Sequence, residues 1–337
     1  MQPDVFVIGG GPAGLAAAIA ATRRGMRVIV ADGNRPPIDK ACGEGLMPDS
    51  RRIAAQLGIG LPDSLGRTFK GIRFVSAGRT VKAEFPGPGG IGVRRTALHQ
   101  QLVQAAEQAG VELRWGSPVK DIEGINARWI IGADGSGSRV RHLAGMEPCI
   151  SSTRRYAWRQ HFSITPWSDL MEIHWAEGCQ VYVTPTAPSE ICIALISRTA
   201  HMRLAEALER FFPALRERLP ASATSTRERG AVTGSVRLRS VARGKVALIG
   251  DASGSVDAIT GEGIGLSFRQ AAVLAEALEK GDLSIYSRSH PRLAWKPRVM
   301  GRAMLILDRG PGTRQFGMRA LARTPGMFRG LVAVHAS

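Results

Sequence analysis

Three glycines near the start of the chain have the spacing that a nucleotide pyrophosphate requires. Gly9, Gly11 and Gly14 follow the pattern G-x-G-x-x-G directly after the apolar run Val5–Ile8. In such a turn the first glycine permits the bend, the second lets backbone approach the pyrophosphate, and the third lets the next helix pack closely. Asp32 ends the following apolar run. In dinucleotide-binding proteins an acidic residue about 20 positions after the glycines bonds a ribose hydroxyl, and Asp32 stands at that position. This order of strand, turn, helix, strand and acid predicts a dinucleotide site.

Four apolar runs predict the parallel sheet that must carry this turn. They cover residues 5–8, 27–32, 127–132 and 245–249, and none has a polar face, as strands covered on both sides require. Because the last run lies far from the first, the nucleotide-binding unit is discontinuous in sequence. Its other predicted elements are helices at 15–21, 96–109 and 263–279 and strands at 111–115 and 119–122.

The residues between these runs have a different pattern. Strand-like runs separated by turns indicate one antiparallel sheet over 156–198, and residues 69–85 add a strand pair around Ala77-Gly78. These four runs cover 159–164, 171–175, 180–183 and 190–196, and an amphipathic helix is expected at 202–212. The fold class is therefore α/β plus an antiparallel sheet. We assign 1–75, 90–150 and 230–295 to the nucleotide-binding domain, 76–89 and 151–229 to a substrate domain, and 296–337 to a helical C-terminal segment.

Composition narrows the classes of protein that remain. The chain has 337 residues and a net charge of +17. No nucleic-acid-binding motif accompanies this charge, so we expect a solvated basic surface and no nucleic-acid partner. Four cysteines without C-x-x-C spacing argue against a zinc site or redox pair, and we expect no metal. No apolar run approaches the roughly 18 residues that span a bilayer, and the first strand leaves no room for a signal peptide. We therefore expect a cytoplasmic protein, of undefined oligomeric state.

Further motifs give the chain a resemblance to a known family. Gly132-Ala133-Asp134-Gly135 comes first, and Gly250-Asp251-Ala252 follows, with Gly261-Glu262-Gly263 shortly after it. With them the chain resembles the FAD-dependent oxidoreductases of the aromatic-hydroxylase and geranylgeranyl-reductase superfamily. Arg95 to Leu102 is similar to that family's R-x-x-[FL]-D-x-x-L helix start, with His99 where Asp is usual. The resemblance implies a Rossmann-like FAD domain of the glutathione-reductase type, an inserted β-sheet substrate domain and a helical C-terminus.

The resemblance implies FAD as the cofactor and indicates where its parts lie. The glycine turn would hold the pyrophosphate with Arg95 nearby, and Asp32 would hold the adenosine ribose. Asp251 would bond the ribityl or pyrophosphate region, and N–H groups at 261–264 would face the flavin ring. For Asp134 the alternative to a role at the cofactor is a purely structural role in a turn. The expected cofactor set is Gly9, Gly11, Pro12, Ala13, Gly14, Asp32, Gly33, Arg35, Cys42, Gly43, Arg95, Val119, Asp134, Gly135, Gly250, Asp251, Gly261, Glu262, Gly263 and Ile264.

The loop after Asp32 carries a second resemblance. Cys42-Gly43-Glu44-Gly45 is similar to the C-G-x-G loop of the geranylgeranyl-reductase branch, where that loop lies beside the flavin. The stretch 40–48 also resembles small FAD monooxygenases associated with bacterial type III polyketide pathways. Candidate catalytic residues are Cys42, Arg159, His161 and Tyr182. The alternative for Cys42 is an inert filler, and for the others a sheet-face or surface role.

This resemblance implies an FAD-dependent monooxygenase that oxidises an aromatic or polyketide-like small molecule with NAD(P)H and O₂. The alternative is an FAD-dependent reductase of isoprenoid C=C bonds, with Cys42 as proton source. A third class, a flavin-binding carrier or sensor, is disfavoured because a carrier needs no large inserted sheet.

The C-terminal tail allows two interpretations. Residues 296–337 are dense in arginine and contain no acidic residue after Asp308. A helical cover packed on the substrate domain accounts for this pattern. An amphipathic helix pair on an anionic membrane, handing over a lipophilic substrate, also accounts for it.

Overall fold

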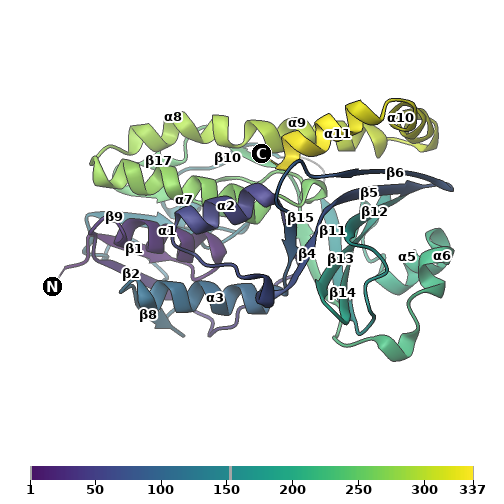
Figure 1. Cartoon of the computed structure of the whole chain (residues 1–337). Helices are drawn as coiled ribbons and strands as arrows, with labels where there is room; N and C mark the ends of the chain where they lie inside the picture. The colour runs from purple at the N-terminus through teal and green to yellow at the C-terminus, as the bar shows by residue number, and fades with distance from the viewer. Residues whose placement is uncertain (1, 152–153, 337) are drawn as a thin grey trace.

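The computed structural model describes residues 2–151 and 154–336, which form two sheets side by side with a row of helices along one edge (Figure 1). The first sheet has the strand order β17-β18-β9-β1-β2-β8. All neighbours in it are parallel except β17 and β18. Its strands are β1 (Val5–Ile8), β2 (Val28–Asp32), β8 (Glu112–Trp115), β9 (Trp129–Gly132), β17 (Ala242–Arg243) and β18 (Val246–Leu248).

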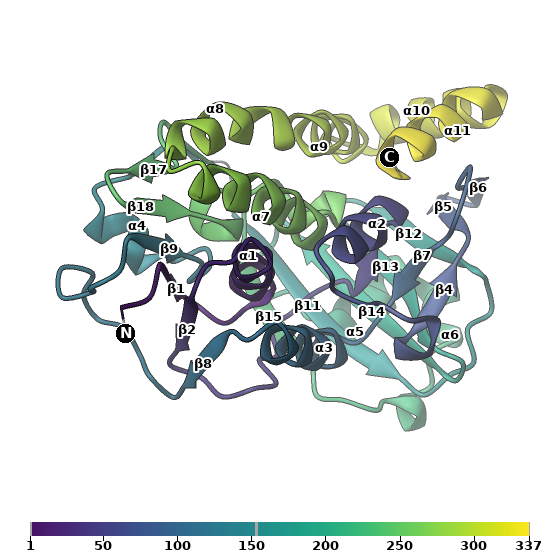
Figure 2. The ribbon, with the colours of Figure 1, turned by 60° about the vertical axis from the view of Figure 1, so that its left-hand side comes forward.

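Helices cover this sheet and bury the apolar runs that the sequence indicates. The helices are α1 (Pro12–Thr22), α2 (Pro48–Gln56), α3 (Arg95–Gln108), α4 (Arg139–Leu143), α7 (Gly263–Glu279) and α8 (Leu283–Leu293). Figure 2 shows α7 packed against α1, although some 240 residues separate the two helices in the sequence. The predicted discontinuous nucleotide-binding sheet is therefore confirmed.

One predicted strand of this unit is wrong. Residues 119–122 form no strand. Instead the Asp121 carboxylate accepts hydrogen bonds from the backbone N–H groups of Ile122 (2.6 Å) and Glu123 (3.0 Å). An aspartate that bonds the next backbone groups in this way favours a turn over a strand ladder.

The second sheet has seven strands in the order β15-β11-β14-β13-β12-β5-β6. They are β5 (Gly71–Ser76), β6 (Arg79–Glu84), β11 (Arg155–Phe162), β12 (Leu170–Ala176), β13 (Cys179–Ala187), β14 (Glu190–Ser197) and β15 (Arg229–Thr233). The antiparallel arrangement is confirmed, with one exception, because β5 pairs with β12 in parallel. The domain limits that we predict at residues 75 and 230 each fall inside a strand of this sheet, β5 and β15. The sequence around each limit does not reveal this, because β5 pairs with β12 and β15 pairs with β11, both far away in the sequence.

Each face of the large sheet is covered by its own group of helices. On one face Val181, Ile193 and Leu195 pack with Leu204 and Leu208 of α5 (Leu204–Phe211), which is followed by α6 (Pro213–Glu217). On the other, Phe74 and Ile173 pack with residues of α9 (Trp295–Leu307), α10 (Pro311–Arg323) and α11 (Pro325–Ala336). The tail is thus a helical cover on the substrate sheet.

Short elements complete the chain between the two large sheets. A three-stranded sheet joins β3 (Gly45–Leu46), β7 (Gly90–Gly92) and β4 (Arg67–Phe69), and β10 (Pro148–Ser151) pairs with β16 (Val236–Leu238). Short 3₁₀ turns lie at 63–65, 221–223, 250–253 and 258–260. Among the described residues, no helix has both the length and the apolar character needed to cross a bilayer.

Candidate active site

The glycine turn has one closed and one open side. Gly9 has φ +111°, and a Cβ there would overlap the Ala133 carbonyl oxygen. A Cβ on Gly14 would overlap the carbonyl oxygen of Gly9, so α1 approaches the turn as closely as a glycine allows. Around Gly11, by contrast, a Cβ would meet no atom within 4 Å. The turn therefore presents an open backbone face at the start of a helix, which is the arrangement that binds a phosphate.

Two side chains hold the middle of this turn. The Asp32 carboxylate accepts hydrogen bonds from the backbone N–H groups of Gly10 (2.7 Å) and Asn34 (2.7 Å). The His99 Nε2 lies 2.8 Å from the Gly10 carbonyl oxygen. Burial lowers the pKa of His99, so its ring is neutral and Nε2 donates. Thus His99, where the family has Asp, is a positioning residue for the turn.

Arg95 lies beside this turn with part of its charge unmatched. Its positive charge contributes to the lowered pKa of His99, after the larger effect of burial, which places the two side chains close together. Its Nε is buried and has no hydrogen-bond partner among the described residues. A buried guanidinium nitrogen without an acceptor is costly. A phosphate oxygen would supply the acceptor that this nitrogen lacks among the described residues.

The remaining expected cofactor residues lie along the carboxyl ends of the parallel strands. Gly261 (φ +67°) and Gly263 precede or begin α7, and a Cβ on either would meet no atom within 4 Å. Their backbone is therefore open, whereas the Glu262 carboxylate lies 3.3 Å from Arg269. Asp251 is half-exposed and faces Lys40 at 3.8 Å. Gly250 and Asp251 line a small pocket with Gly254, Ser255, Val256, Gly263, Leu266 and Gln270.

Asp134 has the structural role that the sequence left open. Its carboxylate accepts hydrogen bonds from the Ser138 hydroxyl (2.5 Å) and the backbone N–H groups of Arg139 (2.7 Å) and Val140 (3.1 Å). It thereby holds the first turn of α4, which leaves the backbone at Gly135 as the part of this motif that faces Lys40. A direct contact of the Asp134 side chain with the cofactor stays a prediction.

The residues expected near the adenosine end of the cofactor also lie close together. The loop at Gly33 lies against Pro118, and Arg35 lies near Gly116. Val119 is partly buried and packs against the apolar cluster that contains Ile8, Ile130 and Val140. Pro12 and Ala13 form the first turn of α1. The two loops that follow β2 and β8 thus border one end of the glycine turn, where an adenosine would lie.

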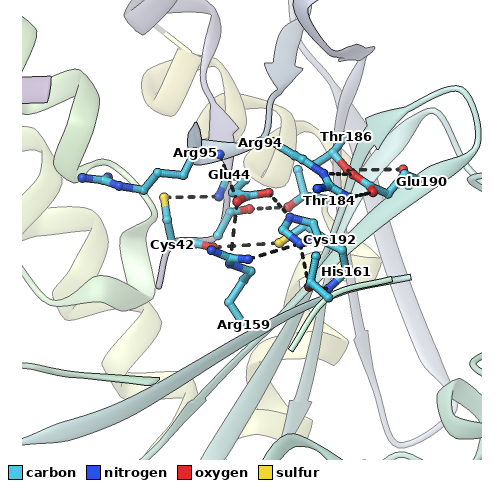
Figure 3. A network of polar contacts seen from close by, with 12 residues as sticks. Cys42, Glu44, Arg94, Arg95, Arg159, His161, Thr184, Thr186, Glu190 and Cys192 are labelled. Atoms are coloured by element: carbon cyan, nitrogen blue, oxygen red, sulfur yellow. Dashed lines mark hydrogen bonds and ion pairs between the residues drawn. The ribbon is translucent and has the colours of Figure 1, made fainter. Parts of the chain in front are cut away.

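A buried polar cluster connects the Cys42–Gly45 loop to the large sheet (Figure 3). Glu44 is 3% exposed and has φ +60°, a backbone conformation that costs energy for any residue but glycine. Its Oε1 accepts the Arg95 N–H (3.0 Å), and its Oε2 lies 2.7 Å from His161 Nε2. Arg159 can only donate, and its Nη1 lies 3.2 Å from His161 Nδ1. His161 therefore donates through Nε2 to Glu44.

The same loop is also held by its backbone. The Thr184 hydroxyl donates to the Gly43 carbonyl (2.8 Å), and the Cys192 thiol to the Cys42 carbonyl (3.8 Å). Burial raises the pKa of Cys192 well above its ordinary value, so it is a neutral thiol. Cys42 itself is only partly buried, and its Sγ accepts the Glu44 N–H at 3.4 Å. The loop is therefore a rigid support that fixes the Cys42 side chain.

Three of these side chains have the spacing of metal ligands. Ligand atoms of Glu44, His161 and Cys192 lie within 4.8 Å of one another. However, the Arg159 guanidinium lies 3.7 Å from the Glu44 carboxylate and already supplies a positive charge there. We therefore keep the prediction that this cluster holds no metal.

The candidate catalytic residues Arg159, His161 and Tyr182 lie on the same face of the large sheet, but their surroundings differ. The pairings Arg159–Ala194, His161–Cys192 and Tyr182–Ala194 place these side chains on the face turned towards the Cys42 loop. Only Arg159 and His161 reach Glu44. The Tyr182 hydroxyl donates to the Ile259 carbonyl (2.6 Å), and burial raises its pKa. Tyr182 is therefore a neutral phenol whose hydroxyl is already hydrogen-bonded, and it lies between the polar and apolar parts of the face.

The apolar part of this face forms a pocket under the C-terminal helices. Its single polar lining residue is Thr260, which directly precedes Gly261. The pocket lining therefore includes the residue directly before the segment where the flavin ring is expected. It is lined by Ile72, Phe74, Met171, Ile173, Thr260, Met300, Ala303, Met304, Leu307, Leu321, Phe328, Leu331 and Val332.

Comparisons with known proteins identify the class of this site. The family model described as an FAD binding domain matches residues 2–281. Menaquinone reductase of Mycolicibacterium smegmatis is 28% identical, over 87% of this chain and 80% of that protein. A 3-(3-hydroxy-phenyl)propionate/3-hydroxycinnamic acid hydroxylase of Mycobacterium avium is 32% identical, over 45% of this chain and 30% of its own length. A flavoprotein/dehydrogenase structure from Cytophaga hutchinsonii, 18% identical, has a TM-score of 0.85 and covers 99% of this chain and 92% of that one.

The chain belongs to the FAD binding domain family. It is an FAD-dependent oxidoreductase, and the open glycine turn with the unpartnered Arg95 Nε fits the FAD pyrophosphate. Sequence reasoning missed Glu44 as a functional residue, although its motif was noticed. The signal in the sequence is the position of Glu44 between Gly43 and Gly45, which is typical of a turn and so of the positive φ that Glu44 adopts.

Proposed function

We propose that this protein is an FAD-dependent monooxygenase that hydroxylates or oxidises an aromatic or polyketide-like molecule. NAD(P)H supplies two electrons and O₂ supplies the inserted oxygen, while the second oxygen atom leaves as water. The observation that carries this proposal is the apolar pocket whose lining includes Thr260, the residue directly before the Gly261–Ile264 segment. The hydroxylase similarity supports the same reaction type, over less than half of the chain.

FAD, when bound, supplies the redox chemistry and the activation of O₂. The protein's own groups bind and orient it. The open backbone at Gly11 and the Arg95 guanidinium, whose Nε is buried, would hold the pyrophosphate, and Asp251 would accept a hydrogen bond from a ribityl hydroxyl. The first N–H groups of α7 would stabilise negative charge on the reduced ring.

The substrate pocket favours a neutral and lipophilic molecule. Among its lining residues only Thr260 offers a hydroxyl. A carboxylate placed in such a pocket would lose its hydration without gaining a partner. Apolar walls also exclude water from the reacting atoms. The substrate class that fits is therefore an aromatic ring with alkyl or further ring substituents.

A second candidate is the reduction of an isoprenoid C=C bond. The observation that favours it is the similarity to menaquinone reductase, which extends over most of both chains. In this case the partly buried Cys42 thiol, held by the Glu44 N–H, would deliver the proton. The apolar pocket would hold the chain.

One experiment separates the two reactions. The FAD-loaded protein is given NADH or NADPH and oxygen-18 gas, with a panel of alkylated phenols and naphthols in one arm and a polyprenyl naphthoquinone in the other. The proposal expects mass spectrometry to find one labelled oxygen in a phenolic product. Consumption of NAD(P)H with no labelled product, together with a polyprenyl chain two hydrogens heavier, would overturn it in favour of the reductase.

A further inference from the structure

The outer surface of the C-terminal helices keeps large apolar side chains in water. On α9, Trp295, Val299 and Ile306 are exposed, and they recur at the spacing of one helical face. On α10, Phe316 is 75% exposed, and on α11 Met327 is exposed too. The opposite face of each helix packs on the large sheet. The helices thus have a second apolar face that their role as a cover does not use.

The charges on this surface all have one sign. Asp308 is the only acidic residue after position 295, and it is buried between Arg155 and Arg198. The exposed charged residues of α9–α11 are therefore all basic. They include Arg302, Arg309, Arg319, Arg323 and Arg329.

The apolar pocket reaches the surface among these helices. Most of its lining is buried, but Ala303 on α9 and Leu331 on α11 are exposed and also line it. Thr260, which directly precedes the expected flavin segment, is among the buried lining residues. α9, α10 and α11 lie along one side of the molecule in both views (Figures 1 and 2). The pocket therefore opens on the same side that carries the exposed apolar and basic residues.

We propose that α9, α10 and α11 dock on an anionic lipid bilayer, and that the pocket takes its lipophilic substrate from that bilayer. Exposed aromatic and aliphatic side chains enter the interface, while arginines bind lipid phosphates. A nucleic acid would use the arginines but leave Trp295 and Phe316 in water. The docking rests on this surface alone, whereas the substrate route also rests on the proposed function.

Vesicle co-sedimentation of the full-length, FAD-loaded protein tests the docking. We expect binding to phosphatidylcholine vesicles that contain 30% phosphatidylglycerol, and at least about tenfold weaker binding to pure phosphatidylcholine or at 0.5 M salt. The double substitution W295S/F316S should weaken binding about tenfold. The matched control I150S/V232S removes two equally exposed apolar residues from β10 and β15, and should bind like the wild type.

A second pair of variants tests the charge. R302Q/R319Q should lose most binding to anionic vesicles. R210Q/R218Q, with Arg210 on α5 and Arg218 directly after α6 at the opposite face of the large sheet, should not. Equal binding to neutral and anionic vesicles, or unchanged binding of both test variants, would overturn the proposal. A protein that dimerises through this surface, with dimers lost in W295S/F316S and no vesicle binding, would overturn it in favour of a second copy.

The pocket is tested without turnover. N-phenyl-1-naphthylamine, an apolar aromatic probe, should gain fluorescence with the protein in vesicle-free buffer. A303W should abolish that gain by filling the pocket mouth, yet bind vesicles normally. If A303W leaves probe binding unchanged, the pocket is not the route. Neither measurement uses catalysis, so a failed oxygen-18 experiment would refute the proposed reaction without touching the docking.

Discussion

The glycine turn and the Glu44 cluster differ in how they are built. The turn uses residues close in sequence, and Gly9, Gly11 and Gly14 act through space that a side chain would fill. The Glu44 cluster joins residues as far apart as Glu44 and His161, separated by 117 positions, and acts through buried charges. In the first site Gly9 and Gly14 leave no room for a Cβ, and in the second each buried charge depends on its partner.

The largest expected effect comes from removing the centre of the cluster. E44A leaves His161 without its acceptor and Arg159 with Asp39 as its remaining acidic partner. Breaking a buried ion pair from one side costs about 3–5 kcal/mol, so we expect a destabilisation near the lower end of that range. Urea unfolding measures it.

A control shows whether this effect comes from the buried network. E279A removes a half-exposed ion pair with Arg24 and should cost roughly 0–1 kcal/mol. Equal losses in E44A and E279A would contradict the difference between the two sites.

Two buried histidines of the nucleotide-binding unit, His99 and His290, have lowered pKa values, and His290 predicts acid sensitivity there. Burial lowers the pKa of His290 to about 4, and its Nε2 lies 3.0 Å from the Ser253 hydroxyl. The unfolded chain takes up this proton near pH 6.5 and the folded chain does not. Stability is therefore present above pH 6.5 and falls towards pH 4, by about 3 kcal/mol for a shift of this size.

The variant H290Q removes this titration. We expect its unfolding free energy to change less between pH 7 and pH 4.5 than that of the wild type, measured by urea titration at each pH. A parallel decline of both proteins would assign the acid sensitivity to other groups.

The glycine turn offers a paired test within three positions. G14A forces a Cβ into the Gly9 carbonyl, and we expect a loss of about 1–3 kcal/mol in stability together with loss of FAD. G11A meets no atom, so it should unfold like the wild type and still bind FAD more weakly. Flavin absorbance after gel filtration and thermal unfolding give the two readouts. If G11A and G14A lose stability equally, the open side of the turn is not where we place it.

These differences explain what the sequence could predict. The turn and its strands follow from local spacing and apolar runs, and the structure confirms them, while the division into domains stays a prediction. The Glu44 cluster does not follow from local patterns, because its partners come from α3, β11, β13 and β14. The parallel pairing of β5 with β12 cannot be predicted from local patterns for the same reason, because the two strands are far apart in the sequence. His99 was noticed as a departure, but its bond to Gly10 depends on how α3 packs on the turn.

Arg95 gives the smallest and most specific effect, because it belongs to both sites. Its backbone N–H binds Glu44, and its side chain keeps a buried Nε without a protein acceptor. R95Q retains the backbone bond, so stability without FAD should stay within about 0.5 kcal/mol of the wild type. FAD affinity should fall about tenfold, as loss of a charged hydrogen bond of about 1.5 kcal/mol predicts. Flavin fluorescence titration of R95Q and R35Q compares this partly buried arginine with an exposed one on the expected adenosine side. A larger loss in R35Q would mean that the cofactor's phosphates lie away from the Glu44 cluster, and that the two sites are independent.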